Sequence, residues 1–146
     1  MIIALAALLC ILQLNPYGEE PGKNPVFISP VKIPLSLSAN FGELRSDHFH
    51  SGVDIKTQGT TGKEIVAAAD GYVYRINVSP GGFGKAVYLR HQSGYSTVYG
   101  HLDRFTPEID EYVKARQYEE KSFMVTLWPP KDRFIFRKGD VIAYSG

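Results

Sequence analysis

Short apolar runs separated by glycine and proline are the feature that most constrains this fold. The 146-residue chain contains 14 glycines, nine prolines, nine tyrosines and eight phenylalanines. A long helix would tolerate so much glycine and proline badly, whereas aromatic and β-branched residues favour strands. The sequence therefore predicts a mostly β protein built from many short strands and turns.

Alternation of apolar and polar residues marks most of the predicted strands. An Asp-Gly pair at 70–71 separates an apolar run from an alternating one, which predicts a β-hairpin at that point. A Gln-Ser-Gly turn joins the next predicted pair. The predicted strands cover residues 35–39, 64–69, 72–78, 85–91, 95–101, 122–128, 134–136 and 141–145, with a short edge strand at 26–29.

One helix interrupts this pattern. The Thr-Pro-Glu sequence at 106–108 predicts a helix start, because Thr suits the N-cap, Pro the first helical position and an acid the first turn. Ile109, Val113 and Tyr118 are the candidates for the inner face of this helix. We therefore predict one inserted helix at about 106–120.

Charge and cysteine content exclude some functions. The net charge of +1 leaves no basic stripe for phosphates, which argues against a nucleic-acid partner. The single cysteine, Cys10, excludes an intrachain disulfide. No Gly-x-Ser-x-Gly, phosphate loop or dinucleotide fingerprint is present. The length and the 44% hydrophobic content are those of one globular domain.

The N-terminal residues predict export. Residues 2–14 carry no charge but are too few for a transmembrane span, which needs about 20 apolar residues. The run suits the apolar core of a signal peptide, so we expect 1–14 to be a leader and the protein to reach the periplasm or cell envelope. A buried N-terminal helix or strand is the alternative. Leu9 is too bulky to precede a lipidated Cys10. Residues 15–34 are proline-rich and predict a linker.

Histidines and a carboxylate gather at residues 48–54. His50 and Asp54 are donor types common in zinc sites. His48 could bind the metal in place of His50, or it could support the ligands or contact a substrate. Four steps along a straight strand would separate His50 from Asp54 by about 13 Å. The two can share a metal only if the chain bends between them, and Ser51-Gly52 allows this. Polar residues in a loop that enters a strand are the alternative.

A further histidine, His101, ends one predicted strand. An imidazole beside a metal site can take or release a proton near neutral pH. A strand-end histidine bonded to backbone is the alternative reading. His91 lies beside a turn, where we expect a structural or exposed role.

Taken in order, these motifs resemble those of the lysostaphin/LytM-type zinc metallopeptidases over roughly residues 38–146. Two of the matching segments, Ala-Ala-Asp-Gly and Gly-Asp-Val-Ile-Ala, also suggest a barrel domain that carries a lipoyl or biotinyl group. Such a domain needs a lysine at a hairpin tip to carry the group, and the Asp70-Gly71 tip offers none. The motifs are Phe41-Gly42 with Arg45, His50 to Ile55, Val66 to Val73, Gly82 to His91, Tyr99 to Leu102 and Lys138 to Gly146.

The resemblance implies an antiparallel β-sheet with a barrel-sandwich core. It also implies an endopeptidase that cleaves peptide cross-links of bacterial peptidoglycan with one Zn²⁺ per complete domain. His50 and Asp54 match the first two zinc ligands, and His101 matches one of two catalytic histidines. Arg45 and Tyr99 lie in matching motifs and, with His48, are candidates for substrate contact or for supporting the ligands. The alternative is a degenerate, non-catalytic domain that binds or activates other cell-wall hydrolases or divisome proteins.

Two departures from the family accompany this resemblance. The closing His-x-His motif, which supplies the third ligand and the second catalytic histidine, matches none of the four histidines. We therefore expect residues 35–146 to be an incomplete domain that holds zinc weakly and turns over negligibly by itself. Residues 103–137 are longer than the usual connection. They are expected either to wall or regulate the substrate groove or to be a surface excursion.

Overall fold

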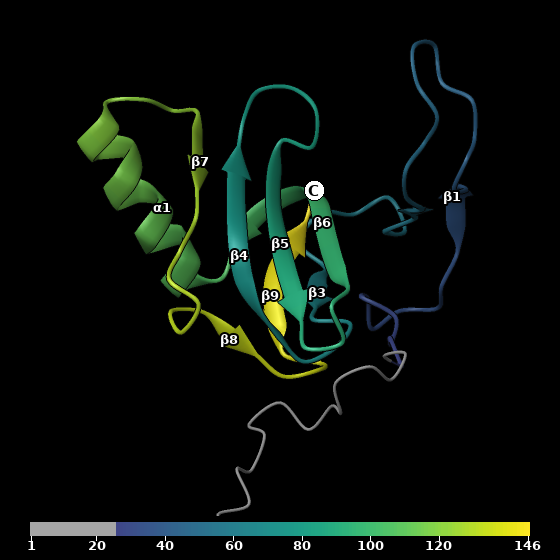
Figure 1. The fold of residues 1–146 in the computed structure, drawn as a ribbon. Helices are drawn as coiled ribbons and strands as arrows, with labels where there is room; N and C mark the ends of the chain where they lie inside the picture. The colour runs from purple at the N-terminus through teal and green to yellow at the C-terminus, as the bar shows by residue number, and fades with distance from the viewer. Residues whose placement is uncertain (1–25) are drawn as a thin grey trace, which may run out of the picture.

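The computed structural model describes residues 26–146, so the predicted leader and most of the predicted linker lie outside the described residues. The protein is mostly β, with one α-helix among the described residues, as predicted (Figure 1). No helix in this part of the chain is long and apolar enough to cross a membrane. The elements in order are β1 Leu37–Ala39, β2 Asp54–Ile55, β3 Glu64–Val66, β4 Gly71–Val78, β5 Lys85–His91, β6 Ser96–Phe105, α1 Pro107–Glu120, β7 Val125–Leu127, β8 Ile135–Phe136 and β9 Val141–Ser145.

Seven strands form one antiparallel sheet, and β1 and β2 form a separate two-stranded sheet. The large sheet has the order β3-β9-β6-β5-β4-β7, and β8 also pairs with β4. This sheet curls into a half-barrel, so that β9 and β3 lie behind β5 and β6 in Figure 1. The two-stranded sheet stands to one side of the half-barrel (Figure 1).

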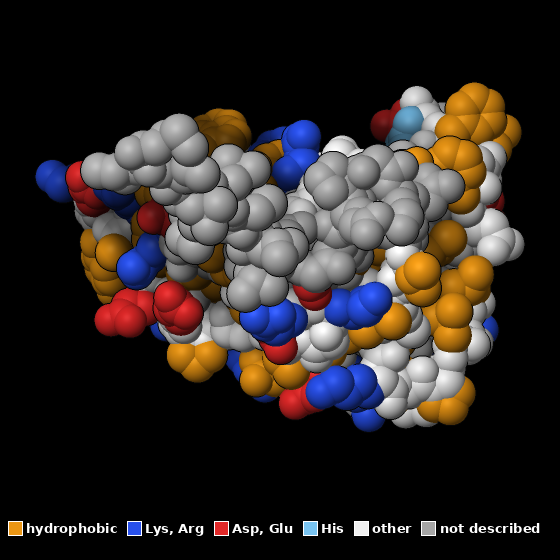
Figure 2. Space-filling view, turned by 60° about the horizontal axis from the view of Figure 1, so that its bottom comes forward, with side chains coloured by type: hydrophobic (Ala, Val, Ile, Leu, Met, Phe, Trp, Pro, Cys, Tyr) orange, Lys and Arg blue, Asp and Glu red, His pale blue; other side chains and the backbone are white. Residues whose placement is uncertain are grey.

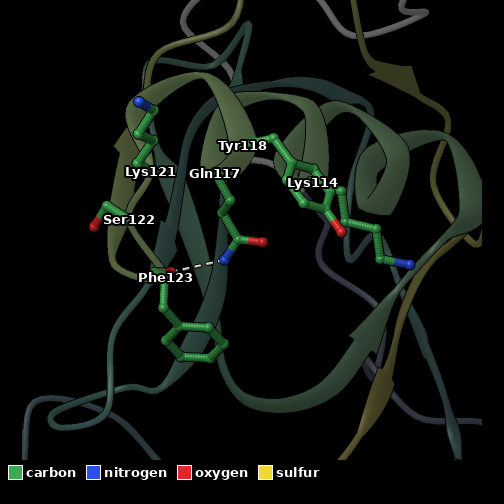
Figure 3. Close-up of a pocket in the computed structure, with 6 residues that line it drawn as sticks. All are labelled: Lys114, Gln117, Tyr118, Lys121, Ser122 and Phe123. Carbon is green, nitrogen blue, oxygen red and sulfur yellow. Dashed lines mark hydrogen bonds between the residues drawn. The ribbon is translucent and has the colours of Figure 1, made fainter.

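The core lies inside the curled sheet and beneath α1. The helix packs against β6 and β7 and buries Ile109 and Val113, as predicted. Tyr118 was predicted to point inward, but it is 83% exposed, so this prediction is wrong. It lines an open hollow at the C-terminal end of α1, where Gln117 Nε2 donates to the Phe123 carbonyl (Figure 3). The other lining residues are Lys114, Lys121 and Ser122.

The hairpin predicted around Asp70-Gly71 is not formed. β3 pairs with β9, with Ile65 opposite Ala143, whereas β4 pairs with β5. The alanine run between β3 and β4 is held instead by the turn that precedes β9. Ala67 makes backbone hydrogen bonds to both Gly139 and Asp140 of this turn. The edge strand predicted at 26–29 is not formed either. Beside β3, Val31 makes an isolated bridge to Ile65, and Ile28 N donates to the Ala68 carbonyl at 2.9 Å.

Residues 103–137 complete the sheet. After α1, the chain returns along the outer side of β4, where β7 pairs with residues 76–78 and β8 with residues 71–72. An uncovered strand edge is a template for unwanted pairing. This segment therefore covers the edge of β4 and does more than cross the surface.

The molecule exposes hydrophobic side chains around the two-stranded sheet. Phe41, Leu44 and Phe49 are 75%, 73% and 68% exposed. Figure 2 shows hydrophobic side chains gathered on the side of the molecule where a histidine is visible. The predicted histidine segment thus lies in an apolar, solvent-facing setting.

Candidate metal site and catalytic histidine

A short hairpin places the first candidate ligand. Glu43 and His50 lie opposite each other, since His50 N donates to the Glu43 carbonyl at 2.8 Å and Gly42 N donates to the His50 carbonyl at 2.7 Å. Arg45 N donates to the His48 carbonyl at 2.8 Å nearer the tip. These bonds fix the backbone of His50 without help from a buried core.

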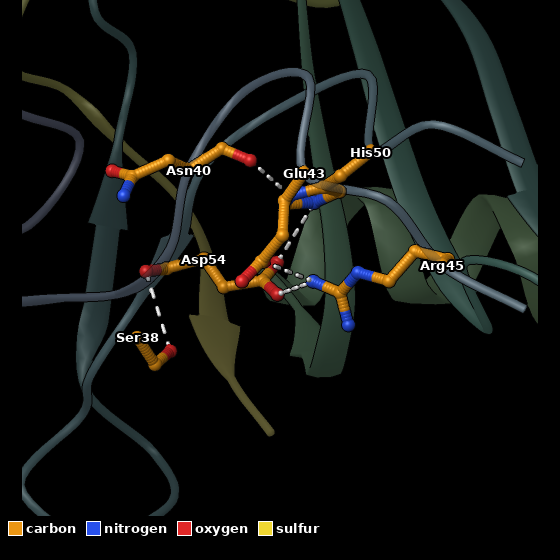
Figure 4. Close-up of polar contacts among 6 residues, drawn as sticks. All are labelled: Ser38, Asn40, Glu43, Arg45, His50 and Asp54. Carbon is orange, nitrogen blue, oxygen red and sulfur yellow. Dashed lines mark hydrogen bonds and ion pairs between the residues drawn. The ribbon is translucent and has the colours of Figure 1, made fainter.

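His50 and Asp54 meet side by side. His50 Nε2 lies 3.2 Å from Asp54 Oδ1 (Figure 4). The chain bends at Gly52, and Asp54 then pairs with Ala39 of β1. Two donors on one tetrahedral zinc, each about 2.1 Å from the metal, lie roughly 3.4 Å apart. The spacing of these two atoms therefore suits a shared metal ion.

The tautomer of His50 also suits a metal. Its Nδ1 lies 3.0 Å from the Asn40 carbonyl oxygen, which can only accept a hydrogen bond. This contact assigns the proton of the neutral imidazole to Nδ1, so the lone pair of Nε2 points toward the Asp54 carboxylate. Two acceptors that face each other need a cation or an added proton between them. A backbone carbonyl behind a histidine is a common way to orient a metal ligand.

Arg45 contacts the other oxygen of Asp54. Its Nη2 lies 2.9 Å from Asp54 Oδ2 and 3.5 Å from a Glu43 carboxylate oxygen (Figure 4). Ser38 Oγ donates to the backbone carbonyl of Asp54 at 3.3 Å. Asp54 is therefore held by Arg45 at Oδ2 and by β1 at its backbone, and its Oδ1 faces His50 Nε2.

His101 stands on a β-bulge in β6. Lys85 pairs with Leu102 and Val87 with Tyr99, so Gly100 and His101 together occupy the place of one residue. The bulge gives His101 a φ of 53°, in the left-handed region that side chains rarely adopt. Bulges of this kind re-aim side chains next to active sites.

The surroundings of His101 leave its imidazole open to solvent. Its side chain is exposed and meets Phe83 edge to face, with ring centroids 6.2 Å apart. Its backbone N donates to the Phe83 carbonyl at 2.8 Å, and its carbonyl accepts from Gly146 N. His101 was predicted to end a strand, but β6 continues past it to Phe105.

Two other histidines lie apart from the His50–Asp54 pair. His48 is exposed and contacts Asp47 at 2.6 Å, and this contact lowers the pKa of the Asp47 carboxyl. His91 is buried, with Nδ1 against the Asp70 carbonyl and Nε2 against Thr97 Oγ1. The structural role expected for His91 agrees with these contacts.

Tyr99 lies in the core. Its hydroxyl accepts hydrogen bonds from Ala68 N at 2.9 Å and from Thr97 Oγ1 at 3.0 Å. Burial raises the pKa of this hydroxyl. Tyr99 is 7% exposed, so the structure places it among the buried residues of the sheet.

Residues 26–146 hold no group of three or more His, Cys, Asp or Glu side chains that could bind a metal ion. The described part of the chain thus brings His50 and Asp54 together and leaves His101 and His48 outside that pair. Sequence spacing had singled out both members of the pair. It gave no sign of the Asn40 carbonyl behind His50.

Comparison with known proteins gives a family match. Residues 48–118 match the model of peptidase family M23. The chain is 39% identical over 79 residues to an uncharacterized metalloprotease of Haemophilus influenzae. The aligned residues are 53% of this chain and 15% of that protein. It is 35% identical over 78 residues to murein hydrolase activator NlpD of Salmonella dublin and of Salmonella typhimurium, again 53% of this chain and 20% of the relative.

These matches confirm the resemblance to the LytM-type peptidases. The chain spans only about a fifth or less of the length of these curated relatives. No solved structure gives a significant match.

Proposed function

The chain belongs to peptidase family M23, and from this premise we propose that it acts as a zinc metalloendopeptidase on the peptide cross-links of bacterial peptidoglycan. The observation that carries the proposal is the contact between His50 Nε2 and Asp54 Oδ1 at 3.2 Å. The Asn40 carbonyl behind His50 leaves Nε2 free to bind a cation. Nitrogen and carboxylate oxygen at this spacing are a donor set that zinc accepts.

Each candidate residue receives a role in this proposal. His50 Nε2 and Asp54 Oδ1 would hold zinc together with a further ligand from outside the described residues. Bound zinc activates water and polarises an amide carbonyl. The exposed imidazole of His101 would take a proton from the attacking water and give it to the leaving amine. The apolar side chains of Phe41 and Phe49 would border the path of the substrate.

The domain organisation and location follow from the same premise. Residues 35–146 would form a metallopeptidase domain, with residues 103–137 as an insertion that closes the sheet edge. Residues 1–14 would direct export to the periplasm or cell envelope, where peptidoglycan is found. The partners of the protein would then be the peptides of the cell wall.

Zinc content and wall cleavage test the proposal. In the full-length protein that carries these residues, His50→Ala should abolish stoichiometric zinc binding and release of cross-linked wall peptides, since it removes one of the ligands. His48→Ala is the matched control, because His48 is a nearby exposed histidine that contacts Asp47 and not Asp54. It should retain both properties. Zinc binding and cleavage that survive in His50→Ala would contradict the assignment.

A non-catalytic activator of other cell-wall hydrolases is the second candidate. It is favoured by the similarity to two proteins named murein hydrolase activator. This function predicts that the protein alone leaves peptidoglycan intact, stimulates a separate wall hydrolase, and does so equally well as His50→Ala. Loss of stimulation in that variant would count against it.

A further inference from the structure

The carboxylate of Asp54 is divided between two partners. Oδ1 faces His50 Nε2 at 3.2 Å, and Oδ2 lies 2.9 Å from Arg45 Nη2 (Figure 4). A carboxylate can bind a cation through one oxygen or both. The contact with Arg45 occupies the second oxygen and leaves the first for the side where the histidine nitrogen points.

The same hairpin fixes both Arg45 and His50. Arg45 N is bonded to the His48 carbonyl, and His50 N is bonded to the Glu43 carbonyl two residues farther from the tip. The Arg45 guanidinium also lies 3.5 Å from the Glu43 carboxylate, and its buried Nε has no hydrogen-bond acceptor in the structure. The guanidinium is therefore directed at the two carboxylates through Nη2, although this leaves one of its own donors unpaired.

We propose that Arg45 is a positioning residue that holds Asp54 for metal binding through Oδ1 alone. This inference rests on the proposed zinc function. A cation beside a metal site would by itself weaken metal binding by repulsion. Here Glu43 and Asp54 together outweigh the one positive charge of Arg45, so the group keeps a net negative charge. Orientation of the ligand is then the larger effect of the arginine.

Metal affinity measured against a chelator tests this role without reference to activity. In the full-length protein, Arg45→Met should bind zinc about 10-fold more weakly, since loss of a residue that orients a ligand commonly costs 10- to 100-fold and this site is partly exposed. Arg45→Lys should recover most of the affinity, because Asp54 receives a single hydrogen bond that an ammonium can replace. Arg116→Met, which removes an arginine paired with Glu119 on α1, should bind zinc as the wild type does.

Cobalt(II) in place of zinc gives a second measurement. In Arg45→Met, Asp54 is free to bind through both oxygens, which raises the coordination number. The visible absorption of the cobalt protein should therefore be weaker than in the wild type and in Arg45→Lys. Far-ultraviolet circular dichroism checks that the variants are folded, and Arg45→Gln replaces Arg45→Met if the latter is not.

The outcomes separate this inference from the proposed function. Equal or tighter zinc binding by a folded Arg45→Met or Arg45→Gln protein, with an unchanged cobalt spectrum, would overturn the role of Arg45 and leave the zinc function standing. A wild-type protein that binds no zinc would overturn both.

Discussion

The half-barrel and the segment that carries the candidate ligands are built in opposite ways. In the half-barrel, Val73, Ile76 and Leu89 are completely buried between strands with long ladders. Across residues 37–55, Ala39 is the one buried residue, and the segment is held by two short strands, a hairpin and ion pairs. The difference separates two functions of side chains: those of the half-barrel supply stability, and those of the ligand segment are free to serve binding.

The same substitution in each region gives the largest test of this contrast. Phe134 is 2% exposed and packs against Tyr112, whereas Phe49 is 68% exposed. Phe134→Ala should lower the free energy of unfolding by about 3–5 kcal/mol, because it removes buried area and leaves a cavity. Phe49→Ala should change it by no more than about 0.5 kcal/mol. Urea unfolding of the two variants measures both values, and similar losses would show that the ligand segment is packed like the core.

Two glycines sharpen the contrast at the level of one methyl group. A Cβ on Gly71 of β4 would lie 2.6 Å from the Arg90 carbonyl oxygen and 2.8 Å from His91 Nδ1. A Cβ on Gly52 would meet only His50 Nε2, at an ordinary 3.9 Å. Gly71→Ala should therefore cost about 1–3 kcal/mol of unfolding free energy, since paired strands must shift apart.

Gly52→Ala is the control for this glycine test. It should leave the unfolding free energy within about 0.5 kcal/mol of the wild type. Thermal or urea unfolding followed by circular dichroism measures the two variants in parallel. A Gly71→Ala protein as stable as Gly52→Ala would mean that β4 and β5 are not held as closely as the contacts indicate.

The contrast also explains what the sequence could predict. The helix and the strands β5 and β9 were predicted closely, because caps, turns and alternation are local properties. The pairing of β3 with β9 was missed, since it joins segments more than 70 residues apart and the Asp-Gly pair favoured a local hairpin. Sequence alone also gave no sign that residues 103–137 would return to cover β4.

The site was predictable to a similar degree. Residue types and spacing selected His50 and Asp54, and the need for a bend pointed to Gly52, where the chain does bend. The orientation of their donor atoms depends on the Asn40 carbonyl and on Arg45, which reach the pair through tertiary structure. Such contacts leave no periodic pattern in the sequence.

His101 is the exception within the half-barrel, and it yields the smallest predicted effect. A side chain at φ 53° costs free energy that glycine does not, and such strain is commonly found at functional positions. His101→Gly should therefore be about 1 kcal/mol more stable to urea than His101→Ala, although glycine usually weakens a strand. If His101→Ala were the more stable variant, the bulge would carry no strain. The half-barrel would then place this imidazole at no expense to its stability, contrary to the idea that β6 is distorted to present it.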